Sequence, residues 1–360
     1  MTTPLSIIAH SRPTIGQEEV QALLAVAGSG QLAQGPCVEE FERRVAALVG
    51  VAGGVAVNSG TAALELALLT LGVGQGDEVI LPSYVCTAPW LAVVRVGGQP
   101  RIVDIESTTY AIDPDEARKA LSPRTKAIIV PHMFGLPADL TRLRMLGVPL
   151  IEDCAQTLGA TEAGHWVGSV GAVTVCSFYA TKLLCTGEGG MLLSNDRRLL
   201  DRGRALRDYD EKPTLDRSAF NRKMTDLQAA LGLSQLKRYK AFLERRAAIA
   251  AAYQTALGRT GLTLPAIPSG RTHIFYRYVV RLPGGTVLDS LIERLERRGV
   301  RCRRPVFRPL HRYLVLKGYP VSEEAYRTAL SLPIYPSLTD QEVARTTHAL
   351  CEELASGDKP

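Results

Sequence analysis

Short apolar runs alternate with longer mixed stretches along the first two thirds of the chain. The runs are rich in valine, isoleucine and leucine, as strands are, whereas the stretches between them carry helical patterns. The runs are almost continuously apolar, so we expect strands buried on both faces of a mostly parallel sheet that helices cover. The fold class is therefore α/β. The expected strands are 53–57, 77–82, 100–105, 125–131 and 148–153, with helices near 61–72, 113–121 and 138–146.

The pattern changes after residue 152. Two strands, 172–179 and 190–195, have no long helix between them, and a long helical stretch follows at 224–257. A helix of that length is typical of a connector between domains. Beyond it come a strand at 274–282, an amphipathic helix at 285–298, short proline-bounded segments and a last helix near 339–355. We therefore expect a large domain at 1–240 and a smaller α+β domain at 241–360.

Composition narrows the class of protein. Hydrophobic residues make up 46% of the chain and charged residues 22%, which is typical of a globular enzyme. The net charge is only +6, with both signs spread along the chain, so we expect no nucleic-acid partner. No run of roughly 18 apolar residues and no secretory signal appears, which predicts no membrane partner and a cytoplasmic location. Seven cysteines without a CxxC pair predict buried thiols and no metal site.

The motif NSGTAALELALL (58–69) turns a strand into a helix. Gly60 allows a ligand to approach the backbone closely, and Thr61 is positioned to cap the helix. The amides and the dipole of the helix N-terminus then form an anion site. Taken alone, this motif favours the alternative interpretation, an ordinary helix cap.

The motif IEDCAQ (151–156) follows an apolar strand, at the sheet edge where open α/β folds bind ligands. Asp153 is suited to pair with a protonated ring nitrogen. Gln156 lies about one helical turn further on and is suited to donate to a phenolate oxygen. The alternative is that Glu152 or Asp153 only caps the next segment.

The third motif is SFYATKLLCTGEGG (177–190). Its lysine, Lys182, has apolar or small flanking residues, unlike the solvated lysines elsewhere in the chain. A lysine that holds a cofactor as a Schiff base needs a fixed backbone and a partly desolvated amine. Ser177 is placed to give its hydroxyl to a phosphate, and the glycines let the chain fold closely against the site.

These motifs together resemble the DegT/DnrJ/EryC1/StrS family of pyridoxal-phosphate (PLP) aminotransferases. The resemblance covers almost the whole chain, and the family's motifs occur in the family's order. It implies fold type I, with a large PLP-binding domain and a small C-terminal domain. The motifs are SGTAAL, GDEVI, TKAIIVPHMFGLPADL, EDCAQTLGA, SFYATK, GEGG, NRKMTDLQAALG and SLPIYPSL.

The resemblance implies a role for each matching residue. Lys182 holds the cofactor and moves the proton, Asp153 binds the pyridine nitrogen, and Gln156 binds the ring hydroxyl. A phosphate cup is formed by Gly60, Thr61 and Ser177. Asn221, in FNRKMTD, reaches the phosphate of a neighbouring subunit's cofactor, which implies a homodimer with shared active sites. From spacing alone, Asn221 is equally well a turn residue before the long helix.

Two positions depart from the family pattern. Cys86 stands where an aromatic residue usually stacks on the cofactor ring, and a thiol offers less stacking area. Tyr84 or Trp90 are the candidates to compensate. Lys223 replaces the usual arginine of the NxRM motif and loses its planar fork of donors.

The expected reaction is transfer of an amino group from an amino acid, L-glutamate being the expected donor, to a nucleotide-diphosphate-linked keto-sugar. Lys182 favours this over the sugar 3-dehydratases of the family, which have histidine there. The alternatives on the same scaffold are a cyclitol (inosose) aminotransferase, an amino-dehydroquinate aromatizing enzyme and a dehydratase. A PLP-bound regulator is the non-enzymatic alternative, but we find no segment for a DNA-binding module.

Several arginines and two histidines lie outside these motifs. The arginines of 293–305 form either a cationic rim for the diphosphate or a solvated helix end, and the second is favoured for Arg294 and Arg297. His132 and His311 are expected to be hydrogen-bonded structural residues. Substrate choice is expected to depend on the loops at 10–35, 205–221 and 300–320.

Overall fold

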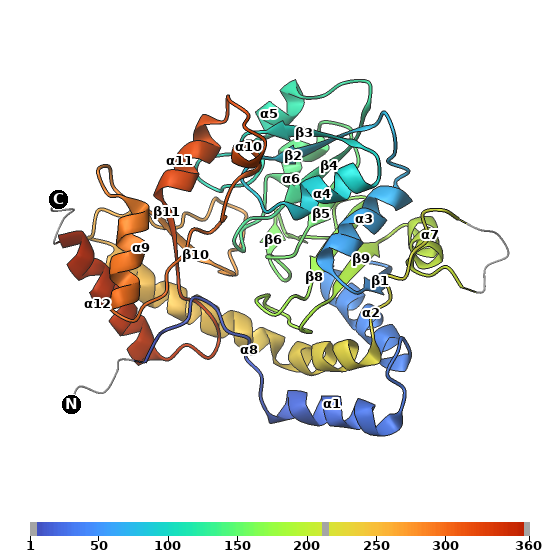
Figure 1. Ribbon diagram of the computed structural model, residues 1–360, viewed down its shortest axis with the longest axis horizontal. Helices are drawn as coiled ribbons and strands as arrows, with labels where there is room; N and C mark the ends of the chain where they lie inside the picture. Colours follow the sequence, from blue (N-terminus) through green and yellow to red (C-terminus); the bar gives the residue numbers. More distant parts are fainter. Residues whose placement is uncertain (1–5, 211–215, 356–360) are drawn as a thin grey trace.

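A seven-stranded sheet forms the centre of the larger part of the molecule (Figure 1). The structure is a computed structural model that describes residues 6–210 and 216–355. The strand order is β1-β9-β8-β5-β4-β2-β3; β9 runs antiparallel to both of its neighbours, and the pairs from β8 to β3 are parallel. The strands are β1 (Gly53–Val57), β2 (Glu78–Pro82), β3 (Gln99–Val103), β4 (Thr125–Pro131), β5 (Leu150–Asp153), β8 (Val173–Ser177) and β9 (Gly190–Ser194).

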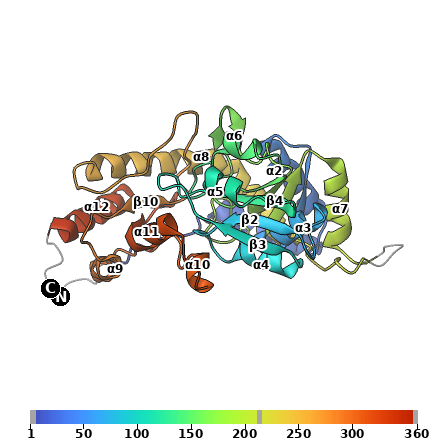
Figure 2. The same cartoon turned by 90° about the horizontal axis from the view of Figure 1, so that it is seen from above.

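Helices cover both faces of this sheet (Figure 2). One face packs against α2, α5, α6 and the first half of α8, and the other against α3, α4 and α7. Because both faces are covered, the strands are apolar almost throughout, and the expected α/β class with a mostly parallel sheet is confirmed. The helices are α2 (Pro36–Val49), α3 (Gly60–Thr70), α4 (Ala88–Arg95), α5 (Pro114–Lys119), α6 (Leu140–Arg144) and α7 (Arg197–Arg207).

Helix α8 (Asp226–Leu257) runs from one core to the other, as expected of a connector (Figure 1). It starts at a capping box in which Thr225 and Gln228 satisfy each other's backbone amides. Its first half is tied to the large core by the Tyr239 hydroxyl, which donates to the carbonyl of Leu158 at 2.5 Å. Its second half is tied to the small core by the Tyr253 hydroxyl, which donates to Pro333 at 2.7 Å. Residue 240, the predicted domain boundary, therefore lies inside a continuous helix. Helix α1 (Gln17–Ser29) packs against α8.

The small core surrounds an antiparallel pair of strands, β10 and β11. Ile8 also belongs to this core and forms a bridge with Val300. The predicted range 1–240 thus assigns to the large domain a segment that packs on the small one; a boundary at residue 240 stays a prediction. The remaining elements are β6 (Thr161–Glu162), β7 (His165–Trp166), β10 (Tyr278–Arg281), α9 (Leu288–Arg297), α10 (Leu310–Tyr313), α11 (Pro320–Thr328), β11 (Ala329–Leu332) and α12 (Asp340–Ala355).

The strand expected at 274–282 is shorter than predicted, because its first residues pair with a loop of the large core. Ile274 donates its amide to Gly135 at 2.9 Å, and Arg277 donates to Phe134 at 3.1 Å. Gly135 has φ +103°, and a Cβ there would lie 2.6 Å from the amide nitrogen of Tyr276. This close approach therefore requires glycine. It joins the two cores beside the pocket described below.

No helix within 6–210 or 216–355 is both long and apolar enough to cross a membrane.

We predict that Gly190→Ala destabilises the protein by about 2–3 kcal/mol. A Cβ at Gly190 would overlap the backbone of Ser59 and Gly60, so β9 and the start of α3 would have to separate. Urea unfolding would measure the change. Gly74→Ala is the matched control, because a Cβ there meets nothing and the backbone is not in the left-handed region. Equal stabilities of the two variants would contradict this account of the contact.

Candidate active site

Carboxyl ends of parallel strands and a loop of the small domain enclose one pocket of about 380 Å³. Its wall combines Lys182, Gln156 and Cys86 from the large domain with Tyr276 and Arg277, which precede β10. Asp153 ends β5, and Ser177 ends the neighbouring strand β8. Ligand sites are expected at this edge of an open α/β sheet. The remaining lining residues are Thr87, Met133, Thr181, Pro305, Val306, Phe307, Arg308 and Tyr313.

The anion site is predicted at the start of α3. Gly60 opens this helix beside Ser177, and a Cβ on Gly60 would lie 2.7 Å from the Ser177 Cβ and 2.9 Å from its hydroxyl oxygen. The cap is Ser59, whose side chain accepts from the amide of Ala62 at 3.1 Å. The prediction that Thr61 caps the helix is wrong, because Thr61 already lies within the first helical turn. The Thr61 hydroxyl is thereby left for a ligand, as its expected role in the phosphate cup requires.

Asp153 carries the acidic group of the site. Its Oδ1 accepts from the amide of Ala155 at 3.0 Å. Burial raises the pKa of the Asp153 carboxyl, while the Ala155 amide and the charge of Lys182 act in the opposite direction. A partly buried, desolvated carboxylate of this kind gains most from a cationic partner. A protonated pyridine nitrogen is such a partner, so the residue fits its expected role.

Gln156 is oriented by the loop that follows β4. Its Oε1 accepts from the amide of Phe134 at 2.9 Å, so its amide nitrogen is left to donate. Phe134 itself has φ +61°, an uncommon conformation for a large side chain. Gln156 also lines the pocket with Lys182, as expected of a donor to a ring oxygen.

Lys182 lies on a tight loop between β8 and β9. Its amide donates to Tyr179 at 2.8 Å, and Phe178 and Gly189 close the loop through a second backbone hydrogen bond of 2.8 Å. The Nζ lies 5.2 Å from the centre of the Tyr276 ring. Among the described residues, Lys182 forms no ion pair within 4 Å. Its amine therefore has a fixed backbone, an aromatic neighbour and access to the pocket, as a cofactor lysine needs.

Cys86 lies on the pocket wall with its thiol accessible. Although the residue is exposed, desolvation by the surrounding wall raises the pKa of this thiol, and the Ala88 amide and then the charge of Lys182 act in the opposite direction. Neither residue proposed to compensate for Cys86 reaches the pocket. Tyr84 is fully buried against Tyr110 and Phe134, and Trp90 packs in the core around α3.

Tyr276 and Arg277 are among the pocket residues that belong to none of the sequence motifs. Burial alone would raise the pKa of Tyr276, but Lys182 and then Arg277 lower it to about 8. The signal that could have found them is a charge inside an apolar run, because IFYRYVVRL carries an arginine where a buried strand should not.

Asn221 is exposed and does not line the pocket of its own chain. Its Oδ1 accepts from the amide of Lys223 at 3.2 Å, as a turn residue does. The Lys223 amine pairs with Asp208 at 3.0 Å. A role for Asn221 in a neighbouring subunit stays a prediction.

His132, Glu152 and Cys154 have ligand atoms within 4.8 Å of one another. Their hydrogen bonds account for this cluster. His132 accepts from the amide of Ala138 through Nδ1, so its Nε2 carries the proton and donates to Glu152 at 3.1 Å. Burial alone would raise the pKa of Glu152, but His132 and the amides of Gly168 and Gly171 hold it below its usual value. The predicted structural role of His132 is confirmed.

The arginines of 293–305 do not line the pocket. Arg294 and Arg298 pair with Glu353, and Arg304 pairs with Asp289. The interpretation as a cationic rim is therefore wrong for these residues, which join elements of the small domain.

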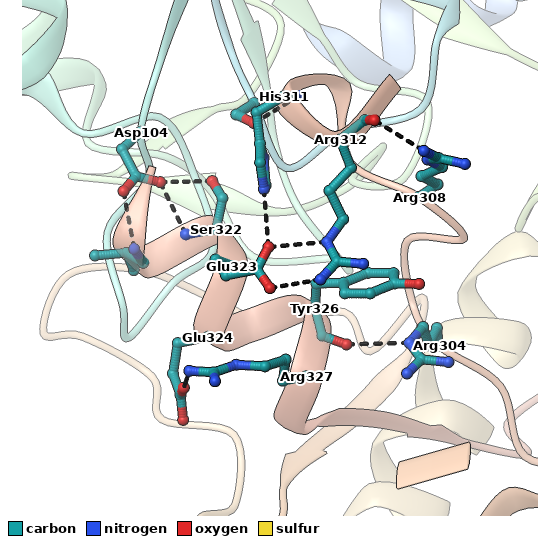
Figure 3. Close-up of polar contacts among 12 residues, drawn as sticks. Asp104, Arg304, Arg308, His311, Arg312, Ser322, Glu323, Glu324, Tyr326 and Arg327 are labelled. Atoms are coloured by element: carbon teal, nitrogen blue, oxygen red, sulfur yellow. Dashed lines mark hydrogen bonds and ion pairs between the residues drawn. The ribbon is translucent and has the colours of Figure 1, made fainter. Parts of the chain in front are cut away.

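His311 is the second structural histidine (Figure 3). Its Nδ1 lies 2.7 Å from the Ser83 hydroxyl, and its Nε2 lies 3.1 Å from Glu323, as expected of a hydrogen-bonded structural residue. Glu323 also forms two hydrogen bonds with Arg312, at 2.6 and 2.8 Å. This network joins α10 and α11 to the loop that follows β2.

Lys182 lines this pocket, and the Asp153 carboxyl and the start of α3 lie at the same edge of the sheet, an arrangement that fits a phosphorylated pyridine cofactor. Residues 13–351 match the DegT/DnrJ/EryC1/StrS aminotransferase family. The chain belongs to this family.

Individual proteins of this family are similar to the chain over most of its length. The chain is 35% identical to GDP-perosamine synthase of Caulobacter vibrioides, over 89% of this chain and 91% of that protein. It is also 35% identical to dTDP-3-amino-3,4,6-trideoxy-alpha-D-glucose transaminase of Micromonospora megalomicea, over 92% and 94%. The structure of Spr1654 from Streptococcus pneumoniae in its PLP form has a TM-score of 0.92 and 27% identity, covering 97% of this chain and 99% of that one. The predicted fold type, aminotransferase activity and PLP cofactor are thereby confirmed.

We predict that Tyr276 ionises near pH 8 in protein freed of cofactor, instead of near its ordinary value of 10. The phenolate is stabilised because Lys182 and Arg277 are cationic there, so it forms as pH rises through 8. Difference absorbance of tyrosinate against Tyr276→Phe would show this step. Lys182→Met should move the step to higher pH. An unchanged midpoint in that variant would show that Lys182 is not its cause.

Proposed function

We propose that this protein transfers the amino group of an amino acid, L-glutamate in the first instance, to a keto-sugar linked to a nucleoside diphosphate. The observation that carries the proposal is the amine of Lys182 in a pocket whose wall also holds two arginines, Arg277 and Arg308. Both substrates are anions, and guanidinium groups suit carboxylates and phosphates alike. The nucleotide-sugar names of the two relatives support the same substrate class.

When bound, PLP supplies an electron sink that weakens bonds at the substrate carbon carrying the nitrogen. Lys182 would hold the cofactor and then use its free Nζ to remove the proton from the donor's Cα. The same amine returns a proton when the sugar carbon is aminated. Asp153 would accept a hydrogen bond from the ring nitrogen and keep it cationic, and Gln156 would donate to the ring oxygen. Gly60, Thr61 and Ser177 would hold the phosphate at the start of α3.

The proposal includes a homodimer in which Asn221 serves the neighbouring subunit, and a cytoplasmic location. The exposure of Asn221 leaves its side chain accessible to a second chain. The loops at 10–35, 205–221 and 300–320 are proposed to select the sugar and nucleotide. Residues 211–215 of the second loop lie outside the described part of the chain.

An uncharged cyclitol is the alternative acceptor. It would leave Arg308, on the pocket wall, without an anionic partner in the second half of the reaction. The nucleotide-linked acceptor therefore agrees better with the charge of the wall.

We predict that Lys182→Met abolishes turnover, lowering it by at least about a thousandfold, because no other amine lines the pocket described here. The visible absorption of bound cofactor should shift, and borohydride should no longer attach the cofactor covalently. Lys126→Met is the matched control, since Lys126 is exposed on β4. Retained covalent attachment in Lys182→Met would contradict the assignment.

The proposed substrates are tested by mixing the PLP-bound protein with single amino acids and then with a panel of keto-sugar nucleotides. Mass spectrometry should show one amino group replacing one carbonyl oxygen on a nucleotide-linked sugar. Amination of inosose, with no nucleotide-linked sugar converted, would favour the cyclitol alternative.

A further inference from the structure

We infer that Arg277 binds the α-carboxylate of the amino-acid donor and so determines donor specificity. This inference rests on the proposed function and names the residue that recognises one of its two substrates.

The first observation is where Arg277 lies. It lines the same pocket as Lys182, and both cations flank one aromatic ring: the Lys182 Nζ is 5.2 Å, and the Arg277 guanidinium carbon 5.4 Å, from the centre of Tyr276. The hydrogen bond from the Arg277 amide to Phe134 fixes its backbone beside the pocket. Arg277 is therefore a cation built into the wall next to the reacting amine.

The second observation is that no acid neutralises Arg277. Within 6–210 and 216–355 it forms no ion pair within 4 Å, and its buried Nε–H has no acceptor. Its Nη1 donates to His10 Nε2 at 3.1 Å. The Ser331 hydroxyl lies 2.9 Å from the same nitrogen. Because arginine can only donate, that nitrogen of His10 must be unprotonated.

His10 is therefore a neutral partner. Burial, and then the charges of Arg277 and Arg303, lower the pKa of His10 to about 3, so the ring is uncharged at every pH at which the enzyme would work. The imidazole holds the guanidinium in place without cancelling its charge. A partly buried cation with a neutral anchor is poised for an anionic ligand.

Two other arginines of the small domain, Arg312 (Figure 3) and Arg304, show the contrast. Arg312 pairs with Glu323, and Arg304 pairs with Asp289. Arg308 is the other arginine of the pocket without such a pair among the described residues. It is exposed, donates to the carbonyl of Arg312 at 2.9 Å and lies over Tyr313.

The chemistry of the substrates decides which arginine takes which anion. The α-carboxylate of an amino acid is one bond from the carbon that loses its proton to Lys182, so it must lie close to that lysine. The diphosphate of a nucleotide-linked sugar is separated from the reacting carbonyl by the sugar ring. Arg277 shares Tyr276 with Lys182, whereas Arg308 lies beside the exposed ring of Phe307. Arg277 is therefore the arginine that binds the α-carboxylate of the donor.

The test separates the two halves of the reaction. PLP-bound protein is mixed with increasing L-glutamate, and the visible spectrum follows the first half-reaction. Calorimetry with inorganic pyrophosphate measures diphosphate binding to the same protein. In Arg277→Leu, the glutamate concentration that gives half the maximal rate should rise by roughly 10–100-fold, the loss of a charged hydrogen-bonding pair. Its affinity for pyrophosphate should stay within about twofold.

Two variants serve as controls. Arg303→Leu removes a charge that also acts on His10 but does not line the pocket, and it should leave glutamate saturation unchanged. Arg277→Lys keeps the charge without the planar fork, and it should raise the half-saturating concentration by less than Arg277→Leu does. If Arg277→Leu does not fold, Arg277→Lys takes its place as the test variant.

The outcomes distinguish this inference from the function on which it rests. A wild-type protein that takes the amino group from no amino acid would overturn the proposed function. Only the inference fails if the wild type reacts but Arg277→Leu leaves the half-saturating glutamate concentration unchanged. It fails likewise if Arg277→Lys leaves that concentration unchanged where Arg277→Leu does not fold. Weaker pyrophosphate binding with unchanged glutamate saturation would assign Arg277 to the sugar nucleotide instead.

Discussion

The placement of one partly buried carboxylate, Asp153, near one amine, Lys182, controls the rest of this active site. Asp153 and the loop that carries Lys182 come from neighbouring parallel strands, β5 and β8, so their positions follow from the sheet register. A buried carboxylate is costly unless a cation or hydrogen bonds compensate it. Here the Ala155 amide and the charge of Lys182 compensate only in part, since the pKa of Asp153 stays raised. A protonated pyridine ring, when bound, would supply the cation that offsets the remainder of this cost.

The second constraint is the contact between the two cores. Phe134 and Gly135, in an irregular loop after β4, receive the backbone amides of Arg277 and Ile274 from the small domain. The same loop orients Gln156. This one contact therefore places Gln156, Tyr276 and Arg277 around the same pocket.

The sequence was sufficient for the parts of the site that depend on local order. Lys182, Asp153, Gly60 and Ser177 follow strands or begin a helix, and the structure places them at one edge of the sheet. Tyr276 and Arg277 have the sequence pattern of the start of a strand. In the structure β10 begins only at Tyr278, because the backbone before it pairs with Phe134 and Gly135, which are distant in sequence. Thr61 was mistaken for a cap because Ser59 and Thr61 carry equivalent hydroxyls. Tyr84, one of the two candidates to compensate for Cys86, does not line the pocket because its ring is buried against Tyr110 and Phe134.

For the fold, too, local patterns were predictable and contacts between distant segments were not. The parallel sheet and the long helix follow from apolar runs and from helical periodicity, so they were predictable. The position of Ile8 and His10 on the small domain was not, because a few residues at the start of a chain carry no periodic signal. Their contacts with Val300 and Ser331 lie hundreds of residues away in sequence and arise only in the folded protein.

The central claim is that Asp153 faces the cofactor ring and keeps its nitrogen protonated. The most direct measurement is the nitrogen-15 NMR shift of ring-labelled PLP bound to the wild type and to Asp153→Asn. The account predicts a protonated nitrogen in the wild type and an unprotonated one in the variant, because asparagine cannot balance the positive charge. The same shift in both proteins would contradict it.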